Sequence, residues 1–579
     1  MYGNYSRNKS VQILIALMKH HAVKKVVVSP GTTNIEFVGS IQGDPFFEIY
    51  SSVDERSAAY IACGLAQKSG EPVALSCTGA TASRNYLPGL TEAFYRQLPI
   101  LAITSTQFEG RVGNYFPQVI DRSCVINDTC KLSVQIPEIH SDEEEWSVNT
   151  KINQALLELH HRGGGPVHIN LQTTYNKYFD VSELPKTRYI DRITIDDKFP
   201  DLNKKKVAIF VGAHIEWRNS LTGLVDEFCK KYNGVVLCDH TSNYKGNYGI
   251  DATLICNQEN YTADCRHFDI LIHIGNVSGA DMGTFPNEVW RVNLDGEVRD
   301  TFKRLRYVFE MSEEEFFTYY VTNSNICNRL AFFNEWKKES DNIDQLIPEL
   351  PFSNAWIAQN TIQKLPENAV LYLGILNSLR TWDFFHLSKS ITCYSNTGGF
   401  GIDGGISTAL GMSLTNPITP VYCILGDLSF FYDMNAIGNR FLNNNLRILV
   451  VNNGKGAEFT NYNNPGSQFG KQTEEYIAAA GHYGNKSHRL IKHLAEDLGF
   501  KYFSASSKKE YLESVPEFLD VSSMEKPVIF EVFTDSQNES DALQIMRNLE
   551  KDYKGATKQM IKNMLGDKGV ETVKKLLHK

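Results

Sequence analysis

The sequence predicts an α/β fold of three doubly wound domains, each built on a parallel sheet, followed by a helical C-terminal tail. Three observations support this prediction: short apolar runs recur along the chain, small-residue turns follow them, and helical patterns separate them. Apolar runs without alternation are typical of strands buried on both faces, as in parallel sheets covered by helices. The chain of 579 residues also exceeds what one hydrophobic core usually supports, so several domains are expected.

The predicted domains follow one another without interleaving. The first covers residues 1–185, with apolar runs at 25–28, 73–75, 99–104 and 165–170. An acidic run at 142–145 interrupts it, which we interpret as an exposed loop. A Lys-, Asp- and Pro-rich linker leads to the second domain, residues 200–345, with runs at 207–212, 235–239, 268–275 and 289–293. The third covers residues 352–538, with runs at 370–373, 421–425, 448–451 and 528–533, and a lysine-rich helical extension is expected at 540–579.

Composition excludes several classes of function. The net charge of -9 is spread along the chain without the basic stripe that a phosphate-backbone binder needs, so nucleic acid is not an expected partner. No apolar run approaches the length of a membrane span, and residues 11–18 predict an amphipathic helix. The eleven cysteines are scattered and never spaced C-x-x-C, which indicates reduced thiols in a cytoplasmic protein.

Polar residues end two successive apolar runs of the third domain. Gly426-Asp427-Leu428-Ser429 follows the first run, and Asn452-Asn453 follows the next. The carboxyl ends of neighbouring strands face one crevice in a doubly wound sheet, so Asp427 and Asn453 are expected to reach the same cation. Mg²⁺ prefers oxygen ligands, which a carboxylate, an amide oxygen and the main-chain carbonyl of Lys455 would supply. Helix N–H groups after Asp427 would face phosphates, so a diphosphate ligand is predicted, although either motif alone is also typical of a plain turn.

The paired motifs resemble the diphosphate and Mg²⁺ fingerprint of the thiamine diphosphate enzymes. Two further segments match in the right order: residues 53–66, which contain Glu55, and residues 77–93, which begin Cys77-Thr78-Gly79. Within the family, residues 394–408 and 426–435 are most similar to the MenD-like synthases of the menaquinone pathway. The resemblance covers the first and third domains well and the middle domain only by position.

The resemblance implies roles for the domains and for individual residues. The first domain would bind the pyrimidine ring and the third the diphosphate, while no ligand is predicted for the middle domain. Glu55 would hydrogen-bond the pyrimidine and activate the cofactor, and Ile402 would prop it into a bent shape. Mg²⁺ would be held by Asp427, Asn453 and Lys455. The implied cofactor-binding residues are Glu55, Thr78, Gly79, Gln118, Gly401, Ile402, Gly426, Asp427, Leu428, Ser429 and Asn453.

The implied reaction is decarboxylation of a 2-oxo acid, with the cofactor storing the released electron pair. Thr32, Thr33, Trp382 and Thr397 stand where MenD-like synthases carry arginines, and threonine cannot grip a carboxylate as an arginine fork does. We therefore do not expect the menaquinone intermediate as product. Arg84 and Arg111 are alternative cations, each also typical of a surface ion pair. The substrate candidates are Thr32, Asn377, Ser378, Arg380, Thr397 and Glu458, the last as a possible proton donor.

Several alternatives stay open from the sequence. Simple 2-oxo acid decarboxylases carry a histidine pair that is absent between Thr104 and Asp121, which favours transfer to an acceptor over a simple decarboxylase or an acetolactate synthase-like enzyme. The run 399–404 satisfies G-x-G-x-x-G, so a nicotinamide-dependent dehydrogenase is a rival, and a catalytically silent binding subunit is another. By family precedent Glu55 and Asp427 come from two chains, which predicts a homodimer or a dimer of dimers.

Overall fold

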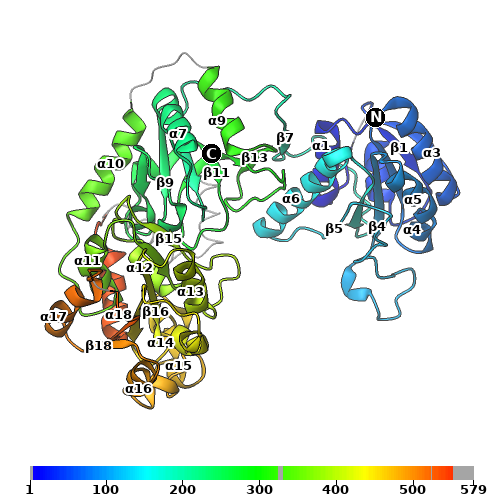
Figure 1. The fold of residues 1–579 in the computed structure, drawn as a ribbon. Coiled ribbons are helices and arrows are strands. Elements are labelled where there is room, and N and C mark those ends of the chain that lie inside the picture. Colours follow the sequence, from blue (N-terminus) through cyan, green and yellow to red (C-terminus); the bar gives the residue numbers. More distant parts are fainter. Residues whose placement is uncertain (1–3, 324–329, 523, 552–579) are drawn as a thin grey trace. The chain divides into compact units, whose positions relative to one another are not determined.

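The computed structural model describes residues 4–323, 330–522 and 524–551, and the chain divides into two compact units (Figure 1). The first unit comprises residues up to 197 together with 295–310, and the second comprises residues 198–294 and those from 311 onward. Parallel sheets covered by helices confirm the predicted α/β fold class. The boundaries 1–185, 200–345 and 352–538 stay a prediction, and most of the extension at 540–579 lies outside the described residues.

The first unit is built on a six-stranded sheet. Its strands pair in parallel in the order β2 (Glu48–Ser51), β1 (Lys25–Val28), β3 (Val73–Thr78), β4 (Ile100–Thr106), β6 (Val167–Gln172) and β5 (Leu132–Ile136). Two separate apolar clusters fill its two faces, which makes the sheet doubly wound. The helices are α1 (Lys9–His20), α2 (Ile35–Ile41), α3 (Glu55–Ser69), α4 (Thr81–Asn85), α5 (Leu87–Tyr95) and α6 (Asp142–Glu158).

Local signals explain where the helices of the first unit begin. Asp54 caps α3 by accepting hydrogen bonds from the N–H groups of Arg56 and Ser57. The interpretation of residues 142–145 as a loop is wrong, because they form the first turn of α6, capped by Ser141. Acidic side chains stabilise a helix N-terminus through its dipole, so a solvated acidic run can begin a helix. The predicted helix at 11–18 is confirmed as α1, and most of its residues are buried.

The second unit contains the middle sheet. Five of its strands pair in parallel in the order β10 (Gly249–Asp251), β9 (Gly234–Cys238), β8 (Val207–Val211), β11 (His267–Ile274) and β12 (Phe285–Val292). Strands β13 (Leu305–Phe309) and β7 (Asp191–Ile193) pair with one another inside the first unit. The accompanying helices are α7 (Asn219–Tyr232), α8 (Thr253–Cys256), α9 (Glu313–Thr322) and α10 (Ala331–Asp344).

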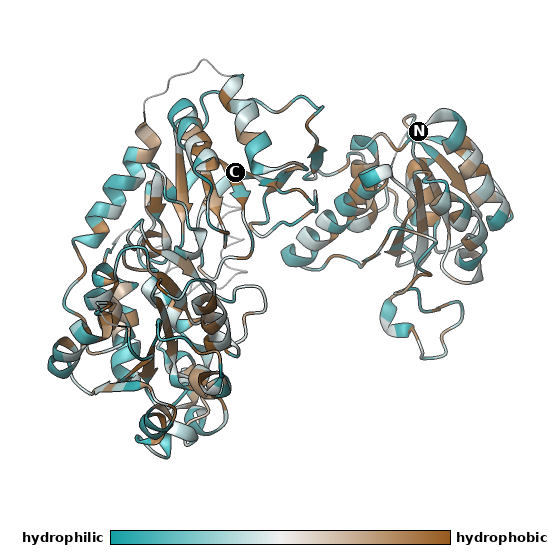
Figure 2. Cartoon of the chain, in the orientation of Figure 1, coloured by the Kyte–Doolittle hydropathy of each residue, from teal (hydrophilic) through white to brown (hydrophobic). Residues whose placement is uncertain are grey.

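The second unit also contains a six-stranded sheet that carries the site described below. Its order is β15 (Thr392–Tyr394), β14 (Val370–Leu373), β16 (Val421–Gly426), β17 (Leu446–Asn452), β19 (Val528–Phe533) and β18 (Lys501–Ala505), all parallel. The strands are the most hydrophobic elements, and the helices turn hydrophilic faces outward (Figure 2). The helices are α11 (Asn354–Thr361), α12 (Asn377–Trp382), α13 (Gly405–Thr415), α14 (Asp427–Tyr432), α15 (Lys471–Tyr476), α16 (Leu490–Asp497), α17 (Lys508–Leu519) and α18 (Ser536–Met546).

The cysteines and the apolar segments of the structure can be compared with the expectations from composition. The described cysteines form no disulfide, and all of them except Cys124 are buried, which agrees with reduced thiols. Within the described residues, no helix is both long and apolar enough to span a bilayer.

His386 gives a pH-dependent link inside the second unit. Its Nδ1 lies 2.7 Å from Asp251 Oδ2 and its Nε2 lies 2.6 Å from Asp344 Oδ2. Hydrogen bonds to these carboxylates raise the pKa of His386 from 6.5 to about 10. The folded pKa exceeds the unfolded one, so the stabilisation is complete below about pH 6.5 and is lost as the pH rises through 10.

We expect His386→Gln to lower the free energy of unfolding at pH 6 by roughly 0.5 to 1 kcal/mol, a small effect because half of the side chain is exposed. Urea denaturation at pH 6 and at pH 10.5 measures the difference, which should disappear at the higher pH. A difference of equal size at both pH values would contradict a charge-based link.

Candidate functional site

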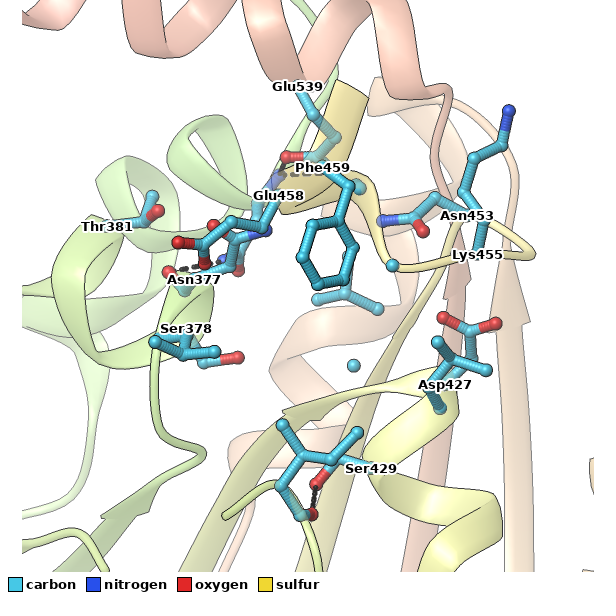
Figure 3. Close-up of a pocket in the computed structure, with 18 of the residues that line it drawn as sticks. Asn377, Ser378, Thr381, Asp427, Ser429, Asn453, Lys455, Glu458, Phe459 and Glu539 are labelled. Carbon is cyan, nitrogen blue, oxygen red and sulfur yellow. Dashed lines mark hydrogen bonds between the residues drawn. The ribbon is translucent and has the colours of Figure 1, made fainter. Parts of the chain in front are cut away.

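A cavity of about 420 Å³ lies at the carboxyl ends of β14, β16 and β17 in the second unit. Figure 3 shows residues from α12 along one side, Asp427 and Ser429 of α14 at the base, and the loop with Asn453 and Lys455 opposite α12. Phe459 and Glu539 complete the wall. Parallel strands that end at one sheet edge therefore bring together side chains from distant parts of the chain, as the two polar motifs predict.

Asp427 is the most buried carboxylate at the base of the cavity. It is 3% exposed and begins α14 directly after β16. Burial raises the pKa of Asp427 to about 7, and the nearby main-chain N–H groups of Leu428 and Asn453 oppose that shift. A carboxylate held in so little water, beside other polar groups, is typical of a cation ligand.

The two asparagines after β17 have different surroundings. The Asn452 amide donates to Glu531 Oε1 at 2.7 Å, and its Oδ1 accepts from the N–H of Gly454. Asn453 lines the cavity, and its buried Oδ1 has no hydrogen-bond partner among the described residues. A buried oxygen without a donor needs an explanation. A cation between Asn453 Oδ1 and the Asp427 carboxylate supplies one, so this donor set fits a divalent metal.

Lys455 enters the predicted metal set only through its main chain. Its ammonium group pairs with Glu474, and the side chain extends away from Asp427 (Figure 3). The loop that holds it has a tight turn at Gly454, whose φ of +75° favours glycine. Asn485 fixes this turn by donating to the Gly454 carbonyl at 3.0 Å.

The segment before α13 closes another side of the cavity. The Ser429 hydroxyl donates to the carbonyl of Ile402 at 2.6 Å, which ties α14 to this segment. Ile402, Gly426, Leu428 and Ser429 all line the cavity. Gly401 adjoins Ile402 and is exposed. The structure thus brings the predicted cofactor residues of the third domain to one place, and their roles stay proposals.

The candidate substrate residues of α12 divide into two groups. Asn377 and Ser378 line the cavity, whereas Arg380 is not part of its lining and pairs with Glu458 at 3.0 Å. With its amide nitrogen turned toward Glu458, Asn377 also donates to Glu458 Oε2 and accepts from its N–H, both at 3.1 Å. Glu458 itself lines the cavity.

Two other positions compared with family arginines are buried. Trp382 is fully buried and donates from Nε1 to Asn354 Oδ1 at 3.0 Å. Thr397 is buried and is not part of the cavity lining. Trp382 thus has a structural contact, and a substrate role for Thr397 stays a prediction.

Glu539 is a wall residue that the sequence analysis missed. It lies on α18, accepts from the Thr534 hydroxyl at 2.6 Å and from the Asn354 N–H at 3.0 Å, and burial raises its pKa to about 7. Leu543 lines the same wall one turn later. No motif precedes α18, and only its capping residue Asp535 indicates a helix start. Phe459 was missed as well, although it directly follows Glu458.

The predicted residues of the first unit follow the ends of its strands. Glu55 begins α3 and accepts from the Asn85 amide at 3.2 Å. Thr78 ends β3, and its methyl group occupies the space that a side chain at Gly31 would need. Gln118 is exposed with a φ of +63°, and its side chain forms no hydrogen bond with the residues that the structure describes.

Most of the remaining candidates of the first unit have ordinary hydrogen-bond partners. Thr33 is buried and donates to the Ser105 carbonyl at 3.0 Å, while Thr32 is exposed. Arg84 donates to the Asp121 carbonyl at 2.9 Å, and Arg111 bonds to Gln107. Thr33 is thus a structural residue, and a substrate role for the other three stays a prediction.

Comparisons with known proteins match two separate regions of the chain with family models and most of its length with relatives. The family described as "Thiamine pyrophosphate enzyme, N-terminal TPP binding domain" matches residues 8–124, and its C-terminal TPP binding counterpart matches residues 377–532. The 2-succinyl-5-enolpyruvyl-6-hydroxy-3-cyclohexene-1-carboxylate synthases of Bacteroides fragilis and Flavobacterium johnsoniae are 31% and 28% identical. These matches cover 93% and 92% of this chain and 98% and 97% of the relatives.

A solved structure shows a weaker likeness. The thiamine diphosphate-dependent 4-hydroxybenzoylformate decarboxylase of Rhodococcus jostii RHA1 has a TM-score of 0.39 and 14% identity, over 91% of this chain and 99% of that one. The score is too low to support an argument.

The protein is a thiamine diphosphate enzyme, since the terminal thiamine pyrophosphate-binding domains match in the order predicted. More particularly, the chain belongs to the family of the 2-succinyl-5-enolpyruvyl-6-hydroxy-3-cyclohexene-1-carboxylate synthases, the MenD-like enzymes. The resemblance stated from the motifs is confirmed, and so is thiamine diphosphate as cofactor. The nicotinamide alternative built on residues 399–404 finds no support in these comparisons.

Proposed function

We propose that the protein uses thiamine diphosphate and Mg²⁺ to decarboxylate a 2-oxo acid and transfers the resulting acyl carbanion to a carbonyl acceptor. The observation that carries this proposal is the buried Asn453 Oδ1 without a partner beside the buried Asp427 carboxylate. Bound cofactor would supply the electron sink for loss of carbon dioxide. The buried free thiols fit a cytoplasmic protein.

In this proposal each residue has a limited task. Asp427, Asn453 and the Lys455 carbonyl hold the metal, and Gly426, Leu428 and Ser429 lie against the diphosphate. Ile402 supports the middle of the cofactor from the segment that Ser429 fixes. Glu55, with Thr78, Gly79 and Gln118 around it, binds the pyrimidine ring and moves a proton at its nitrogen. The proposed roles of these residues are to orient the cofactor and to transfer a proton, while the cofactor supplies the electron sink.

We further propose that the active enzyme is a homodimer or a dimer of dimers. Glu55 lies in the first unit and Asp427 in the second, and separate thiamine pyrophosphate-binding domains match the two. Each cofactor would then be held by Asp427 of one copy and Glu55 of the other, in a twofold arrangement. Mixing inactive Glu55→Gln and Asp427→Ala chains tests this, because shared sites would recover part of the activity.

The charges around the cavity favour a donor without a second carboxylate. Besides the proposed metal ligand Asp427, Glu458 and Glu539 line it, while the nearby cations Arg380 and Lys455 already pair with Glu458 and Glu474. A 2-oxo acid with a distal carboxylate would meet like charge, and an uncharged side chain would meet Ile375, Phe400 and Phe459. We therefore propose substrates different from those of the named synthases.

Glu458→Gln tests this charge argument. Glutamine can keep the contact with Asn377 but leaves Arg380 without a carboxylate partner. We expect kcat/KM for 2-oxoglutarate, relative to 2-oxopentanoate, to rise roughly tenfold, since a charged hydrogen bond contributes about 1.5 kcal/mol or more. The matched control is Glu475→Gln, which removes an exposed carboxylate outside the cavity. If the ratio of the two kcat/KM values is unchanged, Glu458 does not discriminate between substrates by their charge.

The overall proposal is tested by measuring carbon dioxide release from a panel of 2-oxo acids, with and without aldehyde and enone acceptors. Acceptor-dependent formation of a new carbon–carbon bond supports carboligation, and release of free aldehyde alone supports the simple decarboxylase. If no acid is turned over while Mg²⁺ and thiamine diphosphate still raise the Tm, the silent binding subunit is the correct reading.

A further inference from the structure

Arg122 is a buried cation without a carboxylate partner in the first unit. Its side chain is 4% exposed, and its Nη2 bonds to the amide oxygen of Asn170. Its Nε and Nη1 have no hydrogen-bond partner among the residues that the structure describes. Burial lowers its pKa to about 10, so the guanidinium stays charged at neutral pH. A buried charge that is neither paired nor fully hydrogen-bonded is rare in native proteins.

The loop after β3 is shaped to admit this guanidinium. A Cβ at Gly79 would lie 2.5 Å from Arg122 Nη1 and 2.8 Å from Nη2. It would also lie 2.6 Å from the Ser105 carbonyl oxygen, which cannot move as a side chain can. Glycine at position 79 therefore leaves the space that the Arg122 head group occupies.

A small cavity of about 30 Å³ lies beside the guanidinium. Arg84 and Arg122 both line it, and its lining contains no acidic residue. His168 lines it too, but burial lowers the pKa of His168 to about 3, and its two ring nitrogens contact the hydroxyls of Thr104 and Ser133 at 2.7 and 2.8 Å. Burial also raises the pKa of the Cys130 thiol to about 11, so this thiol is neutral.

Two acidic residues of the first unit, Asp121 and Glu55, have other partners. Asp121 accepts from the N–H and hydroxyl of Ser123 and is exposed, and Glu55 accepts from Asn85. Asp121 and Glu55 are not part of the cavity lining. Two arginines thus line this small pocket without an acidic residue in its lining, and the buried one, Arg122, has no carboxylate partner among the described residues.

We propose that this cavity binds one small monovalent anion of the size of chloride, held by Arg122. A volume of about 30 Å³ is of the size that one small ion fills. Apolar walls from Leu90 and Ala102 suit a weakly hydrated halide. The bound anion balances the guanidinium and so holds the loop at Gly79 in one position. This inference concerns the protein without cofactor and goes beyond the proposed function.

The first test compares the Tm of the cofactor-free protein in sodium bromide, sodium chloride and sodium gluconate at equal ionic strength. Equal ionic strength removes screening as a cause of any difference. We expect the Tm to be about 3 °C higher in either halide than in gluconate, because a ligand of the folded state stabilises it. Crystals grown in bromide should show one anomalous peak within hydrogen-bond distance of Arg122.

Arg122→Gln should remove the difference between halide and gluconate, whereas Arg96→Gln, which changes an exposed arginine of the same unit, should keep it. If Arg122→Gln does not fold, the bromide peak in the parent protein decides the question. Equal Tm values in all three salts, together with only water density in the cavity, would overturn the proposal. A 2-oxo acid bound at Arg122 in place of bromide would also overturn it.

Discussion

Replacing Asp427 with alanine should abolish the rise in Tm that Mg²⁺ and thiamine diphosphate together produce, and should lower activity more than about 100-fold. Loss of an outer partner of a metal ligand already costs 10- to 100-fold, so loss of a ligand should cost more. The only other side-chain oxygen that we assign to the metal belongs to Asn453. A retained response to Mg²⁺ and cofactor would contradict our assignment of the metal site.

The stability of the unliganded variant separates a lost ligand from a damaged fold. The folded pKa of Asp427 is about 7, above its usual 3.8, so ionising this carboxylate costs folding free energy. The cost is absent near pH 4 and complete above about pH 7. Asp427→Ala without ligands should therefore be no less stable than the parent at pH 8. The control Asp497→Asn removes an exposed aspartate and should keep the full ligand response.

Glu55→Gln should lower kcat by about 10²- to 10⁴-fold, the usual contribution of a positioned acid or base, while the cofactor still binds. Glutamine keeps the size of the side chain and its contact with Asn85, but it cannot supply the negative charge. Steady-state carbon dioxide release measures kcat, and the shift in Tm with cofactor measures binding.

Glu92→Gln is the matched control for this position, because it replaces an exposed glutamate on α5 of the same unit. It should leave both measurements unchanged. If Glu55→Gln keeps the kcat of the wild type, Glu55 takes no part in the reaction. If the variant loses only cofactor binding, Glu55 is a binding residue and not a catalytic one.

The sequence alone predicts the strands and the base of the cavity because both depend on local patterns. Apolar runs identify β16 and β17, and polar residues directly after them must lie at one sheet edge. Glu539 could not be found in this way, since it reaches the cavity from a helix that follows the last strand of its sheet. Its position depends on packing against α11, which no local pattern encodes.

The partners of charged side chains also could not be predicted from the sequence. Arg380 was a candidate for a substrate cation, yet its partner is Glu458, which lies in a different segment of the chain. Arg122 could not be identified from the sequence, because an isolated arginine in an irregular segment belongs to no motif. Its interest comes only from burial without a partner, which depends on the folded surroundings.

The contrast between Asn452 and Asn453 has a consequence for how natural variation would spread in this protein. Asn452 holds Glu531 and the Gly454 turn, so most replacements there would reduce the amount of soluble enzyme in the cell. The Asn453 Oδ1 has no partner among the described residues, so we expect a replacement of this side chain to leave abundant protein without bound metal. If Asn453 binds the metal as we propose, two identical and adjacent residues would affect different properties, one the amount of folded enzyme and the other its metal content.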